Sequence, residues 1–293
     1  MNIWGAIIGS VVICHLAALT AQATNVEMSA PSGVSVSYDP FTGFPGLEDV
    51  TFELISSGHE ASLPARLIIK PEFGTDFQLT STGVPLELEI VSNAGGMTTG
   101  RYEMPVMLSP NASQQLAVTF KVPAGQYADA GQADINLIAE LVDAATGQPL
   151  ASEHVLQINC DVPSRAQTNF AGTTPGYANG IGTAHIDFGH IIPGDSRQIN
   201  FQVRGNANVM VMISSENNGK MVNQEDALVT PVGYSIIADG IPSDLSAPLN
   251  LFRLPEKTLT GSSYPLKVTL DPMSVTPFAG IYKDIISIDV TPQ

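Results

Sequence analysis

Short segments in which apolar and polar residues alternate dominate this sequence, and residues that favour turns separate them. The alternating segments are 34–38, 86–90, 116–121, 199–203, 209–213, 267–270 and 286–290. Successive side chains of a strand point to opposite faces, so such segments predict strands with one face on a core and one in water. Strands this short, bounded by Gly, Pro, Asn and Asp, predict an all-β fold of the sandwich type.

One segment has a pattern that periodicity does not settle. Residues 134–142 (DINLIAELV) place apolar side chains at both strand-like and helix-like spacings. The neighbouring segments are all predicted strands, and this favours a strand here as well.

The first 23 residues form an apolar run that ends in small residues, Ala21-Gln22-Ala23. This pattern predicts a signal peptide, residues 1–23, that directs export and is cleaved after Ala23. The remaining length suits two domains. Residues 161–183 are rich in Gly, Thr, Pro, Ala and Asn, so we place domains at residues 24–160 and 161–293.

The charge balance and the missing motifs narrow the function classes. The chain has 12 basic and 28 acidic residues, a net charge of −16, which argues against nucleic acid and against docking to anionic membranes. No nucleophile elbow, phosphate loop or zinc-protease motif occurs, and the His residues are scattered. We therefore predict no catalytic residue, no metal and no cofactor, and a protein that is not an enzyme.

After removal of the signal peptide, Cys160 is the only remaining cysteine. A single cysteine cannot form a disulfide within the mature chain. The thiol is either a small buried hydrophobic group or a reactive group, and the frequent burial of free cysteine favours the first.

Several segments of the second half carry a family resemblance. They are IDFG at 186–189, PGDSR at 193–197, VRGN at 203–206, SSENNGKM at 214–221, GYS at 233–235, DG at 239–240 and AGIYKD at 279–284. Together they resemble the spore coat protein U domain, the subunit fold of archaic (Csu-type) chaperone–usher pili. In the first half, SYDP at 37–40 and VPAGQ at 122–126 are similar more loosely. Two such domains behind one signal peptide resemble the tip adhesin of these pili.

The resemblance implies two immunoglobulin-like sandwiches, the C-terminal one lacking its last strand. The groove that results would be filled first by a periplasmic chaperone and then by a strand from the adjacent subunit, with an outer-membrane usher as a further partner. Tyr282, Ile286, Ile288 and Val290 would border the groove, with Ser287 and Asp289 facing outward. The protein would pass through the periplasm to the cell surface at the pilus tip.

Three function classes are compatible with these observations. The first is a tip adhesin that mediates surface attachment and biofilm formation, and the second is a shaft or coat subunit with no receptor of its own. The third is a secreted enzyme built on a sandwich, for which no convergent polar residues are found. Residues 24–32 (TNVEMSAPS) discriminate the first two, because a shaft subunit inserts this tail into a neighbour.

Receptor-binding residues are expected on apolar, glycine-rich loops of the first domain. The candidates are Phe41, Phe44, Leu47 and Met97. Exposed apolar patches often mark interaction sites, and a hydrophobic abiotic surface is one candidate receptor. The alternative is that Phe41, Phe44 and Met97 cover the core of the sandwich.

Overall fold

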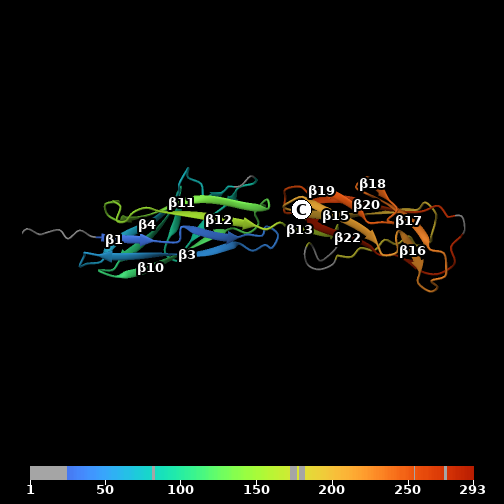
Figure 1. Cartoon of the computed structure of the whole chain (residues 1–293), viewed down its shortest axis with the longest axis horizontal. Helices are drawn as coiled ribbons and strands as arrows, with labels where there is room; N and C mark the ends of the chain where they lie inside the picture. The colour runs from blue at the N-terminus through green and yellow to red at the C-terminus, as the bar shows by residue number, and fades with distance from the viewer. Residues whose placement is uncertain (1–24, 81–82, 172–176, 178–181, 254, 274–275) are drawn as a thin grey trace, which may run out of the picture.

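A computed structural model describes residues 25–80, 83–171, 177, 182–253, 255–273 and 276–293. The predicted signal peptide, residues 1–23, lies outside these. Every regular element in the described residues is a strand, and two sandwiches lie end to end in an elongated molecule (Figure 1). The described residues contain no helix long and apolar enough to span a membrane. The predicted all-β sandwich fold is confirmed.

The N-terminal sandwich consists of two facing sheets. One has the order β1 (Asn25–Ser29), β3 (Gly46–Ser57), β10 (Ser113–Val122), β7 (Glu89–Val91). The other has the order β2 (Gly33–Ser37), β12 (His154–Val162), β11 (Gly131–Asp143), β4 (Leu63–Pro71), β9 (Arg101–Leu108), β8 (Gly96–Thr98). β5 (Gln78–Leu79) pairs with β6 (Leu86–Glu87), and β2 pairs parallel to β12, whereas the other pairs are antiparallel.

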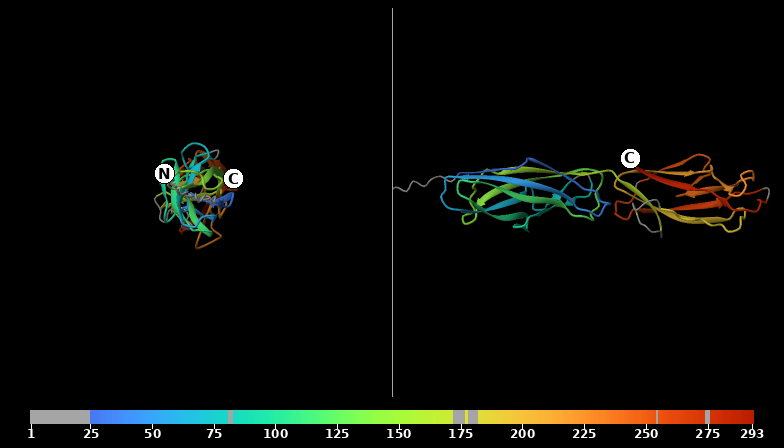
Figure 2. Two further views of the ribbon diagram at one scale, coloured as in Figure 1. Left: turned by 90° about the vertical axis from the view of Figure 1, so that its left-hand side faces the viewer. Right: turned by 90° about the horizontal axis from the view of Figure 1, so that it is seen from below.

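The C-terminal sandwich also has two sheets. The larger has the order β13 (Ala166–Phe170), β14 (Ser196–Gly205), β20 (Ser262–Leu270), β17 (Val232–Ala238), β16 (Lys220–Asn223), β21 (Tyr282–Lys283), and β18 (Ile241–Ser243) pairs with β17. The smaller has the order β19 (Leu249–Arg253), β15 (Val209–Ser215), β22 (Ile286–Pro292). β22 ends beside the N-terminal sandwich, where Figures 1 and 2 show the C-terminus near the middle of the molecule.

Each sandwich has its own hydrophobic core, and the two cores differ in how well they are covered. Among the described residues, the N-terminal core has 31 buried members and 7 partly buried ones. The C-terminal core has 14 buried members and 14 partly buried ones. Half of the apolar side chains on the second core thus keep contact with water, and burial is the main favourable term in folding.

The strand predictions agree with the structure in most places. Residues 134–142 lie inside β11, whose inward residues Leu137, Ala139 and Leu141 are fully buried. The segment 86–90 is divided between β6 and β7. The domain boundary predicted after residue 160 falls inside β12 (His154–Val162), which belongs to the first sheet pair, and the division into two domains stays a prediction.

Cys160 lies on β12 with no exposed surface, and burial raises the pKa of its thiol to about 11. A thiol with this pKa is almost entirely protonated at neutral pH, and the thiolate is the reactive form. The structure therefore favours the small buried hydrophobe over the reactive group.

Two segments of the loose first-domain resemblance meet in space. The Tyr38 hydroxyl donates to the Gln126 carbonyl oxygen at 2.8 Å and accepts from the Gln126 N–H at 2.9 Å. The Gln126 side chain in turn accepts from the Glu87 N–H at 2.7 Å and donates to the Pro123 carbonyl. Tyr38 is 1% exposed, so this hydroxyl is the hydrogen-bonding end of an otherwise apolar core residue.

Tyr38→Phe is expected to lower the free energy of unfolding by about 1–3 kcal/mol. The substitution keeps the ring but leaves the Gln126 N–H and carbonyl without this partner. Urea unfolding followed by far-ultraviolet circular dichroism measures the effect. An unchanged unfolding midpoint would show that water replaces the hydroxyl at no cost.

Candidate functional site: the open edge of β22

One edge of β22 is left without a paired strand in the part of the C-terminal sandwich that the structure describes. β22 pairs antiparallel with β15 along its whole length, from Ile286 opposite Ser215 to Pro292 opposite Val209. Within the described residues no strand pairs with its other edge, although β13 of the facing sheet lies alongside. Unpaired N–H and C=O groups on such an edge can pair with an added strand.

The apolar face of β22 is incompletely covered. Ile286, Ile288 and Val290 contact the second core and are half-buried. Their register partners show the contrast, because Ile213 opposite Ile288 and Val211 opposite Val290 are both fully buried. Neighbouring strands on both sides account for the burial of the β15 residues, and β22 has such a neighbour on one side.

The predicted orientation of this strand agrees with the structure. Ser287, Asp289 and Thr291 are exposed, while the alternate apolar residues turn toward the core. Tyr282 lies on β21, paired opposite Asn223 of β16, and is half-buried on the same core. The role of Tyr282, Ile286, Ile288 and Val290 as the border of a donor-strand groove stays a prediction.

A carboxylate at the start of β22 accepts five hydrogen bonds. Asp284 Oδ2 accepts from the Ser215 hydroxyl at 2.6 Å and from the Tyr234 hydroxyl. Its Oδ1 accepts from the backbone and side-chain N–H groups of Asn217 and from the Ile285 N–H. Burial, together with the bond to Asp284, raises the pKa of Tyr234 above its ordinary value. This arrangement fixes the point at which the chain enters β22.

The turn before β22 requires glycine. Gly280 has φ +143°, and a Cβ there would lie 2.4 Å from the Asn223 amide nitrogen. The same amide donates to the Ala279 carbonyl at 3.4 Å, and the Tyr282 hydroxyl donates to the Phe278 carbonyl at 3.2 Å. The AGIYKD segment therefore acts as one unit that positions β21 and β22.

The predicted receptor-binding residues lie in different places. Phe41 is 9% exposed, and the Arg204 guanidinium lies 4.8 Å from its ring centroid, so Phe41 is covered by the C-terminal sandwich. Phe44 and Leu47 are 73% and 54% exposed, in and after the loop that joins β2 to β3. Met97 is 44% exposed on β8, the outer strand of the other sheet. The structure does not join the four into one patch, and their receptor role stays a prediction.

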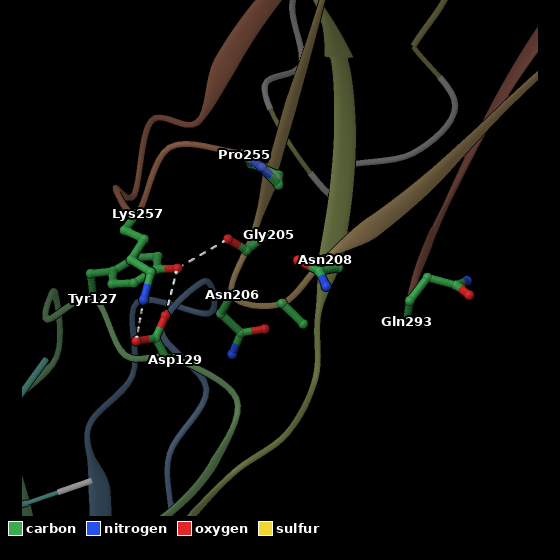
Figure 3. A pocket seen from close by; sticks show the side chains of 9 residues that line it. Tyr127, Asp129, Gly205, Asn206, Asn208, Pro255, Lys257 and Gln293 are labelled. Carbon is green, nitrogen blue, oxygen red and sulfur yellow. Dashed lines mark hydrogen bonds and ion pairs between the residues drawn. The ribbon is translucent and has the colours of Figure 1, made fainter. Parts of the chain in front are cut away.

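Several polar contacts join the two sandwiches, and Figure 3 shows those of Asp129 with Lys257 and of Tyr127 with Gly205. The Asn206 side chain, 3% exposed, accepts from the Arg165 N–H at 2.7 Å and donates to the Pro163 carbonyl at 3.0 Å. The Asn206 carbonyl accepts from the Ala130 N–H at 2.9 Å. Ion pairs join Asp39 to Arg165 and Asp129 to Lys257, each at 2.8 Å.

A hollow of about 270 Å³ lies at this contact and is lined in part by Tyr127, Asp129, Lys257 and Gln293. The Tyr127 hydroxyl donates to the Gly205 carbonyl at 3.3 Å, and burial beside Asp129 raises its pKa to about 12. Gln293 at the end of the chain donates its N–H to the Asn208 carbonyl. The last strand thus ends at the hollow between the two sandwiches.

In the parts of the chain that the structure describes, no group of three His, Cys, Asp or Glu side chains is placed to hold a metal ion.

Sequence reasoning did not identify the roles of Asp284, Asn206 and Arg204. Each lies in a segment that carries the family resemblance, AGIYKD or VRGN. The sequence therefore marks these segments but does not reveal which contacts their polar side chains make. The partners of Asp284 are up to 69 positions away in the sequence.

Comparison with solved structures gives several pilus proteins. The chain is similar to the CsuC–CsuE chaperone–tip adhesion subunit complex of Acinetobacter baumannii, at 14% identity and TM-score 0.43, over 90% of this chain and 99% of that one. It is similar to the CupB6 tip adhesin of Pseudomonas aeruginosa, at 9% identity and TM-score 0.39, over 92% of this chain and 95% of CupB6. It is also similar to CfaE, the adhesive subunit of CFA/I fimbria of enterotoxigenic Escherichia coli, at 11% identity and TM-score 0.35. This match covers 90% of this chain and 93% of CfaE. No family model and no curated protein sequence matches the chain.

Proposed function

We propose that this protein is the tip adhesin of a chaperone–usher pilus. Its C-terminal sandwich joins the pilus by accepting a strand along β22, and its N-terminal sandwich attaches the pilus to a surface, as in biofilm formation. A periplasmic chaperone covers the edge of β22 before assembly at an outer-membrane usher. The chain crosses the periplasm and functions on the cell surface.

The observation that carries the proposal is the half-covered apolar face of β22 next to an edge that no described strand pairs with. Ile286, Ile288 and Val290 contact a core that remains partly open to water. An added strand would bury these side chains and pair the free backbone groups at the same time, which is the geometry of β-strand addition.

The N-terminal segment supports a tip rather than a shaft position. Residues Asn25–Ser29 form β1, which pairs antiparallel with β3 of the same sandwich. Val26 is 5% exposed in the first core, and Met28 and Ala30 pack against that core. A segment used in its own sandwich is not available to a neighbour, whereas a shaft subunit needs such a free donor.

Purification from the periplasm together with the pilus chaperone tests this proposal. The full chain is expected to form a stable one-to-one complex, and a chain truncated after residue 284 is expected to lose it along with β22. A monomeric, heat-stable full chain that binds no chaperone would mean a self-complete sandwich and a free secreted binder.

The predicted receptor contacts have a separate test. Phe44→Ser combined with Met97→Ser is expected to abolish adhesion to a hydrophobic surface without preventing export, because both side chains are exposed and apolar. Val155→Ser is the matched control, since Val155 is 51% exposed on β12, which is separated from β8 by three strands of the same sheet. Adhesion is measured by retention of piliated cells on polystyrene. Wild-type adhesion by the double variant would remove these residues from the receptor site.

A further inference from the structure

The end of the C-terminal sandwich farthest from the N-terminal one carries a group of exposed apolar side chains. In the described residues, seven large hydrophobic side chains are more than 55% exposed, and four of them lie at this end. They are Leu228 at 95%, Phe278 at 70%, Ile281 at 66% and Ile192 at 58%. We call these four residues the far-pole patch. Their segments lie at the right-hand end of Figure 1.

Hydrogen bonds join two segments of the patch to each other and tie the third to β20. The Gln224 N–H donates to the Ile281 carbonyl at 2.8 Å, which joins the loop that contains Leu228 to the one that contains Phe278. The Asn223 side chain accepts from two N–H groups of the first loop and donates to Ala279 in the second. The turn at Ile192 is tied to Leu270 through the Gly194 N–H at 3.0 Å. Polar contacts thus connect these loops to the sandwich, while the four apolar side chains stay exposed.

The open edge of β22 runs between this pole and the other sandwich. β22 begins at Ile286, just after the AGIYKD segment of the pole, and ends at Pro292, beside the contact between the sandwiches. A strand of this length spans roughly 23 Å. A subunit that donates a strand must place its folded body at one end of it. The N-terminal sandwich occupies the end at Pro292, and this leaves the far pole.

From this steric relation we propose that the far-pole patch is a docking surface for the folded body of the adjacent pilus subunit, which contacts it through an apolar surface of its own. The inference rests on the proposed function, because it requires that a strand be donated along β22. Contact at the pole adds buried apolar area to the backbone pairing along the edge.

Leu228→Ser combined with Phe278→Ser tests the proposal, with Phe73→Ser combined with Met107→Ser as the matched control on the other sandwich. Surface fibres are sheared from cells that produce each variant, and the subunit pair that contains this chain is isolated from them. The pole variant is expected to release the adjacent subunit on heating at least tenfold faster than wild type, while the control releases it at the wild-type rate. Equal release rates for all three chains would overturn the docking surface.

Hydroxyl-radical footprinting of unmodified fibres gives a second measurement that needs no substitution. Oxidation of Leu228 and Phe278 is expected to fall at least fivefold in the pair relative to the isolated chain, and unchanged oxidation would overturn the proposal. If the wild-type chain forms no strand-linked pair, the proposed function fails and the docking surface fails with it. If the pair forms and the pole stays reactive, the docking surface alone is wrong.

Discussion

Asp284→Ala is expected to lower the free energy of unfolding of the C-terminal sandwich by about 3–5 kcal/mol. The carboxylate accepts five hydrogen bonds from Ser215, Asn217, Tyr234 and Ile285. Hydrogen bonds to a charged acceptor are worth more than neutral ones, and removal of the carboxylate takes this partner from the buried Tyr234 hydroxyl and from half-buried donors on Ser215 and Asn217. β22 would lose the anchor that precedes its first residue, so we also expect loss of the complex with the chaperone.

Urea unfolding followed by circular dichroism measures this change, and Asp289→Ala is the control. Asp289 lies on β22 itself but is exposed, so its replacement removes the same charge without the hydrogen bonds. Asp284→Asn should fall between the two, because the amide can still accept hydrogen bonds through its oxygen. If Asp284→Ala and Asp289→Ala unfold at the same urea concentration, the carboxylate does not hold the start of β22.

Asn206→Ala is expected to lower the free energy of unfolding by about 2–4 kcal/mol and to loosen the contact between the two sandwiches. The buried side chain holds the segment that joins them, at the Pro163 carbonyl and the Arg165 N–H. The two ion pairs at this contact involve half-exposed basic side chains, and such pairs contribute about 0–1 kcal/mol each. The loss of Asn206 would therefore not be compensated.

Small-angle X-ray scattering tests the loosening, because a hinged pair of sandwiches has a shorter and broader distribution of distances than a rigid rod. Asn208→Ala is the control, since Asn208 lines the same hollow and is exposed, and it is its backbone carbonyl that accepts the Gln293 N–H. Scattering and stability that match the control would show that Asn206 has no special role at the contact.

The sequence predicts the strands better than the contacts between them. The alternation of Ile286, Ile288 and Val290 with polar residues is sufficient to place one face of β22 on a core, because strand geometry is local. The ladder of β11 was harder to predict, since Ile138 and Val142 interrupt the alternation of Leu137, Ala139 and Leu141. The tertiary neighbours of β11 decide its conformation.

Contacts between distant segments were beyond sequence reasoning. Tyr38 and Gln126 are 88 positions apart, and no local rule brings a hydroxyl of one to the backbone of the other. The Gly and Pro residues near Phe41 predict an exposed side chain or a cap on its own core, yet Arg204 of the other sandwich covers it. The sequence around the far-pole patch shows no alternation of apolar and polar residues, because Leu228 and Phe278 lie in loops.

Hydrogen–deuterium exchange of the β22 amides tests the central claim, the acceptance of a strand, most directly. In the free chain, alternate N–H groups of β22 face the open edge and should exchange rapidly, while the groups bonded to β15 exchange slowly. In the chaperone complex and in the fibre, the account predicts that the rapidly exchanging amides become at least 100-fold slower. Rapid exchange at the same amides in both assemblies, or full protection in the free chain, would contradict strand addition at β22.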